Sequence, residues 1–300
     1  MQIMELLEQS KCVRRNVKLS DINWFRVGGV AEYYYKAQTE EDLLLLLKNV
    51  PKDFPLFILG VGSNVIIKDG GVEGVLLRLG RGFSGIEKID ETTLQVGAAA
   101  LDLSVANYAC SEGVSGLEFL SGIPGTIGGA LKMNAGSYGT EISDVLIEAV
   151  AYDLLGNRHV IKSEDMNFSY RKSNPAIEGL IFTGATLKGQ KGEPSQIKQR
   201  IEKIQKSRLE TQPIKSRTGG SSFKNPQGQK AWELIDRAGM RGYNVGGAMM
   251  SDKHCNFMIN KGTATAKDLI GLGEIVRSKV KETCGITLEW EIQIIGKDAE

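Results

Sequence analysis

Two glycine-dense segments contain residue types that could bind a phosphate. They are residues 60–64, Gly-Val-Gly-Ser-Asn, and residues 122–130, Gly-Ile-Pro-Gly-Thr-Ile-Gly-Gly-Ala. Small residues let backbone N–H groups turn toward an anion and let the main chain approach a flat ligand closely. The first segment alone is equally consistent with a plain β-turn. The second is the stronger candidate, and its alternative is a tight turn that only packs. Their presence in one chain favours a phosphate-bearing cofactor.

The context of the first segment argues against a Rossmann fold. The fingerprint G-x-G-x-x-G is incomplete because residue 65 is Val. The run Val65–Ile67 also predicts a strand where the fingerprint requires the start of a helix. We therefore expect phosphate binding by a different architecture.

Two polar clusters could supply donors to an anionic substrate. Arg171 lies among the hydroxyl-bearing residues 169–173, and a guanidinium can bind a carboxylate or phosphate through two bonds. Read without context, a surface arginine is the simpler interpretation. Ser221 and Ser222 follow two glycines that leave their hydroxyls accessible, although such stretches are often only loops. No Ser-His-Asp or G-x-S-x-G pattern supports a nucleophilic serine.

The last element of the chain carries two carboxylates on one face. Apolar and polar residues alternate from Ile286 to Ile294, which predicts a strand with one buried face. Glu289 and Glu291 share the polar face. That face is either solvated or borders a cleft into which one carboxylate points.

Composition excludes several classes of function. The 300 residues include 37 basic and 36 acidic side chains, a net charge of +1, which argues against nucleic-acid binding through a broad basic face. Two histidines exclude a multi-histidine metal site, and four scattered cysteines suit a reducing compartment. The longest aliphatic run, Leu43–Leu47, is too short to cross a membrane, and the start of the chain lacks the apolar stretch of a signal peptide. We expect a cytoplasmic protein with no metal and no membrane insertion.

The elements that must position these residues follow from periodicity and capping. Helices are expected at 1–16, 39–48, 103–112, from about 197, 230–238 and 265–283. Strands are expected after the Gly28–Gly29 turn and at 56–59, 65–67, 75–79, 94–98, 145–154, 158–162, 180–187, within 245–260 and at 286–294. Ser121–Gly139 is predicted to be the longest irregular stretch, and Gly189–Pro194 a connector between domains.

Five motifs, in order, resemble the UDP-N-acetylenolpyruvoylglucosamine reductase family. They are the loop 60–64, residues 121–130 with Asn-Ala-Gly at 134–136, Tyr170-Arg171-x-Ser173, the run 220–226 and the ending Leu-Glu-Trp-Glu at 288–291. The resemblance implies an α+β chain with a vanillyl-alcohol-oxidase/PCMH-type FAD-binding fold. Residues 1–193 would form the FAD-binding region, in subdomains of about 1–75 and 76–193. Residues 194–300 would form the substrate domain, whose last strand returns to the active site.

The resemblance also implies an activity and its residues. NADPH would reduce FAD, and the reduced flavin would reduce UDP-N-acetylglucosamine enolpyruvate to UDP-N-acetylmuramate for peptidoglycan synthesis. Arg171 and Glu291 would stabilise the enolate, and Ser221, which directly follows the family's glycine, would donate the proton. The substrate-binding positions would be Tyr170, Lys224, Asn225 and His254. The FAD-binding positions would be Gly60, Val61, Gly62, Ser63, Asn64, Gly122, Ile123, Pro124, Gly125, Thr126, Gly128, Gly129, Ala130, Asn134, Ala135 and Gly136.

Two features set this chain apart within the resemblance. The short span from Arg171 to the strand at 180 leaves no room for a tyrosine-bearing loop, so the chain resembles the subgroup that lacks it. Trp290 also stands where many members have Pro. We expect a monomer whose partner is a small sugar nucleotide. A sugar or alcohol oxidase on the same fold, or a non-catalytic nucleotide-binding protein, are the alternatives.

Overall fold

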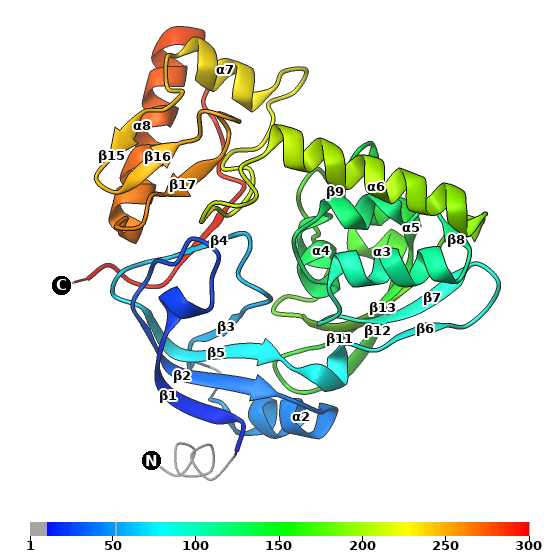
Figure 1. Ribbon diagram of the computed structural model, residues 1–300. Coiled ribbons are helices and arrows are strands. Elements are labelled where there is room, and N and C mark those ends of the chain that lie inside the picture. The colour runs from blue at the N-terminus through cyan, green and yellow to red at the C-terminus, as the bar shows by residue number, and fades with distance from the viewer. Residues whose placement is uncertain (1–10, 52, 300) are drawn as a thin grey trace. The chain divides into compact units, whose positions relative to one another are not determined.

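The computed structural model describes residues 11–51 and 53–299 (Figure 1). The chain groups into two compact units, each assembled from separate stretches of sequence. Unit 1 comprises Met1–Arg14, Tyr34–Gly60 and Val75–Ser207, and unit 2 comprises Arg15–Tyr33, Val61–Gly74 and Arg208–Glu300. The domain boundaries expected near residues 75 and 193 stay a prediction.

A five-stranded antiparallel sheet forms the centre of unit 1, in the order β12-β11-β13-β7-β6. Its strands are β6 (Ile86–Lys88), β7 (Thr93–Gly97), β11 (Leu146–Tyr152), β12 (Arg158–Lys162) and β13 (Ile181–Lys188). The helices that lie over one face of this sheet in Figure 1 are α3 (Asp102–Ser111), α4 (Ile127–Met133) and α6 (Pro194–Thr211). Their apolar sides and the sheet share one core.

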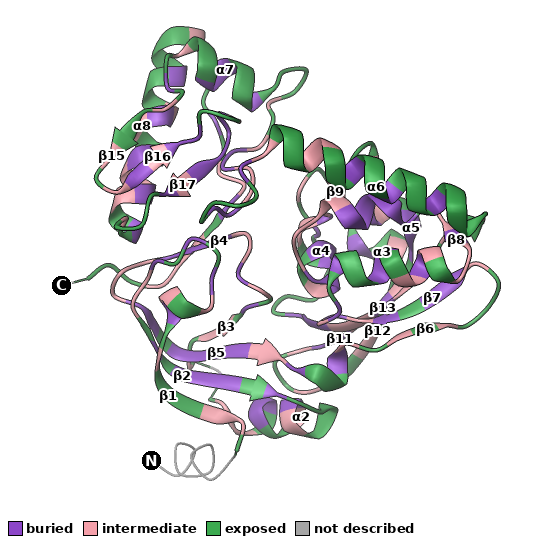
Figure 2. Cartoon of the chain, in the orientation of Figure 1, coloured by how far each residue is buried: buried purple, intermediate pink, exposed green. Residues whose placement is uncertain are grey.

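The spacing of apolar residues explains why α6 covers that core. Ile197, Ile201 and Ile204 are buried and recur at helical intervals. Figure 2 shows purple bands on a helix α6 that is otherwise mostly exposed. Pro194 occupies the first turn, where its missing N–H leaves no bond unmade. The remaining small elements of unit 1 are β8 (Val114–Ser115), β9 (Gly136–Ser137), β10 (Thr140–Glu141), α5 (Ile142–Val145), β14 (Gln190–Lys191), η2 (Arg81–Phe83), η3 (Glu118–Gly122) and η4 (Ser163–Met166).

A second, four-stranded sheet has the order β1-β2-β5-β3. The strands are β1 (Val13–Lys18), β2 (Val30–Ala37), β3 (Leu56–Ile58) and β5 (Val72–Leu79), and β3 runs parallel to β5. Helix α2 (Glu40–Asn49) begins at Thr39, as expected, because Thr39 and Asp42 form a reciprocal capping box.

Unit 2 packs two helices with a small antiparallel sheet. The sheet has the order β15 (Asn244–Val245), β16 (Ala248–Met250) and β17 (Met258–Asn260), and the helices are α7 (Ala231–Arg237) and α8 (Ala266–Cys284). A short η1 (Leu19–Asp21) precedes the loop that supplies Phe25 and Val27 to the core. β4 (Val65–Ile67) pairs in parallel with β18 (Gln293–Ile295). Thr265 and Asp268 form a reciprocal capping box at the start of α8, where a helix was expected from residue 265.

Trp290 is accommodated by a glycine in α8. A Cβ atom on Gly273 would lie 2.0 Å from the Trp290 ring, so only glycine leaves room for the indole. The indole Nε1–H donates to Glu274 at 2.8 Å, and its ring lies 4.8 Å from that of Phe223. Trp290 is therefore packed between α8 and the serine loop, defined here as residues 219–225.

Several expectations about local structure were wrong. Of the helix expected at 1–16, residues 1–10 lie outside the described residues, and Val13 begins strand β1. The stretch 121–139, expected to be irregular, contains helix α4. The helix was not predicted because glycine disfavours helix formation, but Ile127, Ala130 and Leu131 are buried at helical spacing. Two residues of the expected connector 189–194 form β14, paired with β8, and its role as a boundary between domains stays a prediction. Of the strand expected at 286–294, only β18 pairs in a ladder, although the alternating burial of Leu288 and Ile292 is as predicted.

Asp102 is an unusual member of the core of unit 1. This first residue of α3 is fully buried, and neither carboxyl oxygen has a hydrogen-bond partner among the described residues. Burial raises the pKa of the Asp102 carboxyl well above its ordinary value.

Asp102→Asn is expected to become more stable relative to the parent protein as pH rises. The pKa of Asp102 is higher in the folded state than in the unfolded state, so the contribution of protonated Asp102 to the stability of the parent protein is complete below the unfolded-state pKa of about 4. This contribution is lost as pH rises through the folded-state pKa. The loss is about 1.4 kcal/mol per pH unit within that window. Urea denaturation at several pH values measures the difference, with the exposed Asp165→Asn as control. Parallel pH profiles for the parent and Asp102→Asn would contradict the prediction.

Candidate active site

The segment 122–130 is fixed to the chain that follows β7. Ile127 N donates to Ala100 O at 3.0 Å and Gly128 N to Ala98 O at 2.8 Å, while Asp102 N donates to Gly125 O at 3.2 Å. These bonds hold the first turn of α4 in place. Main-chain hydrogen bonds therefore anchor this segment together with the buried side chains of Ile127 and Ala130.

The first turn of α4 presents main chain without side chains in front of it. Gly129 is exposed, and a Cβ atom there would meet only the Thr126 hydroxyl, at 3.9 Å. A Cβ atom on Gly60 would lie 2.9 Å from the same hydroxyl, which explains glycine at that position. Glycine at 60 and 129 thus leaves a strip of backbone beside Thr126 that no side chain of these two residues covers. Such a strip, at the positive end of a helix, fits the pyrophosphate of a dinucleotide cofactor.

The other residues expected to bind the cofactor divide between the two units. Within unit 1, Gly122 packs so closely that a Cβ atom would lie 2.4 Å from Ser137 Oγ, and Asn134 is fully buried. The residues Ile123, Pro124 and Gly125 are half-buried, Ala130 is buried, and Ala135 and Gly136 follow Asn134 toward β9. Val61, Gly62, Ser63 and Asn64 belong to unit 2. Their contacts with a cofactor stay predictions.

Glycine at position 62 is required by two independent constraints. Its φ angle is +68°, and a Cβ atom would lie 2.8 Å from the Cα of Asn23. Trp24 N donates to Gly62 O at 3.0 Å, which fixes the loop 60–64 to the preceding segment of unit 2.

Arg171 occupies a tight turn in unit 1. Ser169 and Lys172 exchange two backbone hydrogen bonds, of 2.9 and 3.1 Å, and Arg171 lies at the turn with φ +57°. Its Nη2 donates to Gly136 O at 3.0 Å, and its guanidinium carbon lies 5.0 Å from the centre of the Tyr170 ring. The guanidinium is half-buried, while Tyr170 is exposed. A cation held in this way can bind a carboxylate with little reorganisation.

The two serines of unit 2 lie in different environments. Ser222 is fully buried, and its hydroxyl accepts a hydrogen bond from Met258 N at 3.2 Å. Ser221 is half-buried, and its hydroxyl makes no hydrogen bond with the part of the chain that the structure describes. Ser222 is therefore part of the scaffold, and Ser221 is the serine whose hydroxyl is available for chemistry.

The two carboxylates at the end of the chain also differ. Glu289 is exposed and lies 3.4 Å from the Lys224 ammonium, which makes it a surface ion pair. Glu291 is half-buried. Its N–H donates to Ser222 O at 2.9 Å, and its carbonyl oxygen accepts from Asn64 Nδ2 at 3.1 Å. Glu291 is thereby fixed between the serine loop and the loop 60–64.

A buried asparagine that sequence reasoning missed holds the serine loop. Asn256 Oδ1 accepts from Phe223 N at 3.0 Å and its Nδ2 donates to Phe223 O at 2.8 Å. The backbone carbonyl oxygen of Asn256 accepts a hydrogen bond from Ser222 N at 2.7 Å. The signal in the sequence was a polar amide between Cys255 and Phe257, in an otherwise apolar run.

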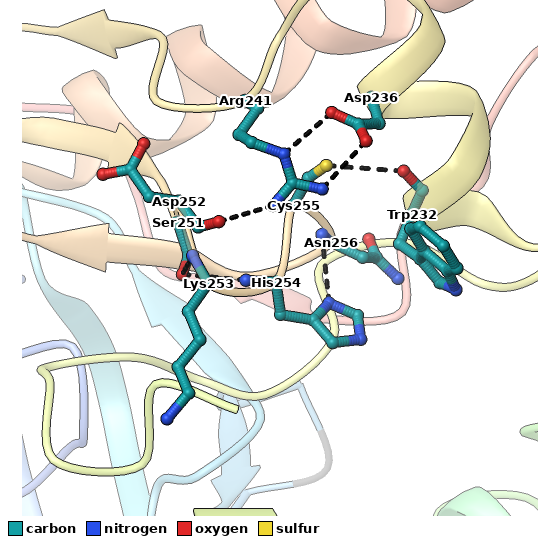
Figure 3. Close-up of polar contacts among 9 residues, drawn as sticks. All are labelled: Trp232, Asp236, Arg241, Ser251, Asp252, Lys253, His254, Cys255 and Asn256. Carbon is teal, nitrogen blue, oxygen red and sulfur yellow. Dashed lines mark hydrogen bonds and ion pairs between the residues drawn. The ribbon is translucent and has the colours of Figure 1, made fainter. Parts of the chain in front are cut away.

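His254 begins the segment that contains this asparagine, and Figure 3 shows its surroundings. Asn256 N donates to His254 Nδ1 at 3.3 Å, and burial lowers the pKa of the imidazole. The ring is therefore neutral with its proton on Nε2. Its ring packs edge-on against Phe257, at 4.7 Å, and Trp232 lies 6.5 Å away. The imidazole can donate one hydrogen bond to an anionic ligand.

A bidentate ion pair between Arg241 and Asp236 is attached to the chain just before His254. Arg241 binds both carboxylate oxygens of Asp236, at 2.8 and 2.9 Å, and also donates to Asp252 O (Figure 3). Cys255 is fully buried, and burial raises its pKa to about 11, so it stays a thiol. Of the other expected substrate contacts, Asn225 is exposed and its Oδ1 accepts the Ala231 N–H that begins α7.

The three expected catalytic residues fall in two groups. Arg171 belongs to unit 1, and Ser221 and Glu291 belong to unit 2. Among the described residues, no cluster of three or more His, Cys, Asp or Glu could hold a metal, and no helix is long and apolar enough to cross a membrane.

Comparisons with known proteins define the class and then the family. Residues 31–160 match the model of the FAD binding domain, which includes the strip beside Thr126. The chain is therefore an FAD-binding oxidoreductase of α+β fold. Residues 212–295 match the model of the UDP-N-acetylenolpyruvoylglucosamine reductase C-terminal domain. The chain belongs to the UDP-N-acetylenolpyruvoylglucosamine reductase family.

Relatives of that name match nearly the whole chain. The reductase of Parvibaculum lavamentivorans is 52% identical over 93% of this chain and 89% of its own length. That of Azorhizobium caulinodans is 51% identical over 95% and 92%. The crystal structure of the Thermus caldophilus reductase superimposes with a TM-score of 0.81 at 36% identity, covering 94% of this chain and 99% of that one. The predicted family, fold class, enzyme class and FAD cofactor are confirmed.

Proposed function

We propose that this protein reduces the enolpyruvyl group of UDP-N-acetylglucosamine enolpyruvate to give UDP-N-acetylmuramate, with NADPH as reductant, in the cytoplasm and as a monomer. The observation that carries the proposal is the 52% identity, over 93% of the chain, to a reductase of this name. FAD, when bound, supplies the hydride that adds to the alkene. The protein's own residues must then bind the substrate anion, stabilise developing charge and deliver one proton.

Arg171 is proposed to stabilise the negative charge that moves onto the substrate carboxylate. The addition of hydride to one alkene carbon breaks the π bond and leaves an enolate-like dianion. A guanidinium that is always charged and already oriented by Gly136 O suits this task. Glu291 is proposed to assist the same step, either as a protonated acid or by orienting Arg171 or a water molecule.

Ser221 is proposed to give its hydroxyl proton to the neighbouring carbon. A carbanion-like centre is a strong base, so a weak acid held at about 3 Å can protonate it. The half-buried Ser221 hydroxyl supports this role, since the hydroxyl of Ser222 is already engaged with Met258. His254, Lys224, Asn225 and Tyr170 are proposed to contact the sugar nucleotide. The Nε2–H of His254 is suited to an oxygen of its diphosphate.

The function is tested by following NADPH oxidation with and without the enolpyruvyl sugar nucleotide. We expect stoichiometric oxidation that depends on the sugar nucleotide and yields UDP-N-acetylmuramate. Oxygen consumption with simple sugars instead would indicate an oxidase, and bound FAD that no sugar nucleotide can reoxidise would indicate a non-catalytic nucleotide-binding protein. Either outcome would refute the proposal.

Gly129→Val is expected to weaken FAD binding without destabilising the protein. A Cβ atom at position 129 makes only an ordinary contact with the Thr126 hydroxyl, but the added side chain would cover the strip of backbone beside Thr126. Loss of one hydrogen bond to a charged group costs about 1.5–3 kcal/mol, which corresponds to about 10- to 100-fold in Kd. Titration of the apoprotein with FAD measures the change. Gly271→Val in α8 is the control, because a Cβ atom there meets nothing within 4 Å. If both variants bound FAD with equal affinity, the strip of backbone beside Thr126 would not be part of the FAD site.

A further inference from the structure

The turn that carries Arg171 is attached to a buried asparagine. Asn134 Nδ2 donates to Ser169 O at 3.3 Å, and Ser169 is the first residue of that turn. Asn134 is fully buried and has φ +40°, at the C-terminal end of α4. Besides glycine, asparagine is one of the few residues that adopt the left-handed conformation readily, which suits Asn134 to this helix end.

The amide of Asn134 is engaged on both of its polar atoms. Its Nδ2 also donates to Glu141 Oε1 at 2.8 Å, and its Oδ1 accepts from Ser143 N at 3.0 Å. Glu141 Oε1 accepts a further hydrogen bond from Ser143 Oγ at 2.9 Å. Asn134 is therefore oriented by the start of α5 and presents its remaining donor to the Arg171 turn.

The guanidinium of Arg171 is held by the same hairpin that holds Asn134. Gly136, whose carbonyl oxygen accepts from Arg171 Nη2, pairs with Glu141 across β9 and β10. The fit is close, since a Cβ atom on Gly136 would lie 2.6 Å from the Cβ of Glu141. The hairpin thus fixes Arg171 twice, through its main chain by way of Asn134 and through its side chain by way of Gly136.

We propose that Asn134 and Glu141 are positioning residues for Arg171. By fixing Ser169 O and the hairpin 136–141, they hold the Arg171 turn, including its left-handed φ of +57°, in the geometry that receives the substrate carboxylate. Both act through Arg171 without touching substrate. The inference rests on the proposed function of Arg171, and displacement of a catalytic group by about 1 Å can cost about 100-fold in rate.

The test uses the FAD-loaded enzyme and separates its two half-reactions by stopped-flow. Asn134→Gly removes the amide and retains a residue suited to positive φ, and Glu141→Ala removes the acceptor. With both variants saturated with FAD, we expect reoxidation by the enolpyruvyl sugar nucleotide to be about 10- to 100-fold slower and reduction by NADPH to be unchanged. Asn167→Gly is the matched control, because Asn167 also has positive φ (45°) but is exposed.

The slower reoxidation caused by Asn134→Gly must also depend on the presence of Arg171. If Asn134 acts through Arg171, Asn134→Gly in an Arg171→Ala background should slow reoxidation no further. Equal losses with and without Arg171, equal losses in both half-reactions, or normal reoxidation of both single variants would overturn the inference. Failure of the proposed function is distinguishable, because the sugar nucleotide would then not reoxidise the parent enzyme. Failure of the proposed role of Arg171 is also distinguishable, because Arg171→Ala alone would then leave reoxidation intact.

Discussion

Ser221→Ala is expected to slow flavin reoxidation by the enolpyruvyl sugar nucleotide about 100- to 10,000-fold, the range for loss of a general acid. Reduction by NADPH should remain nearly unchanged, because it requires no proton from this hydroxyl. Stopped-flow absorbance of the flavin measures each half-reaction separately. The substitution should also leave stability nearly unchanged, since the Ser221 hydroxyl makes no hydrogen bond within the described residues.

The neighbouring serine supplies the control for this prediction. Ser222→Ala leaves the buried N–H of Met258 without its partner, which should cost about 1–3 kcal/mol of unfolding free energy. The folded fraction should reoxidise at a nearly normal rate. The two variants are thus expected to show opposite phenotypes, one kinetic and one of stability. Normal rates in both half-reactions of Ser221→Ala would remove Ser221 from the mechanism.

Arg171→Lys is expected to lower the rate of reoxidation about 100- to 1000-fold, comparable to removing one preorganised donor from an oxyanion site. Lysine retains the charge, but its ammonium cannot both bond to Gly136 O and grip a carboxylate through two parallel bonds. Loss of charge is therefore not the cause of the defect.

Single-turnover measurements with the reduced enzyme test this expectation, and Arg158→Lys is the control at an exposed arginine of unit 1. Added guanidinium should partly restore the rate of Arg171→Ala and should not affect Arg158→Lys. Near-normal reoxidation in Arg171→Lys would show that a point charge suffices.

Local patterns predicted most of the fold because capping and periodicity act over a few residues. Thr39 and Thr265 begin their helices through capping boxes that can be read directly from the chain, and the isoleucines of α6 are buried as their spacing predicts. Helix α4 was missed because its glycines oppose helix formation in isolation, and contacts with Ala98 and Ala100 hold its first turn.

The candidate site depends on contacts between distant residues, which local patterns cannot reveal. The adjacent serines are equivalent in sequence, and only the fold buries Ser222 against Met258, 36 residues away. Likewise, Asn134 was expected to contact the cofactor, whereas its amide bonds to Ser169, 35 residues away. That contact to the cofactor stays a prediction. The resemblance to a family supplied the chemistry, and the structure separates the supporting residues from those available to a substrate.

The packing of Trp290 on Gly273 limits which substitutions this part of the chain can accept. With the indole in its present place, even a methyl group at position 273 would overlap the ring. A side chain can therefore be introduced at position 273 only if the tryptophan is replaced first or at the same time. The two positions are expected to vary together and not independently.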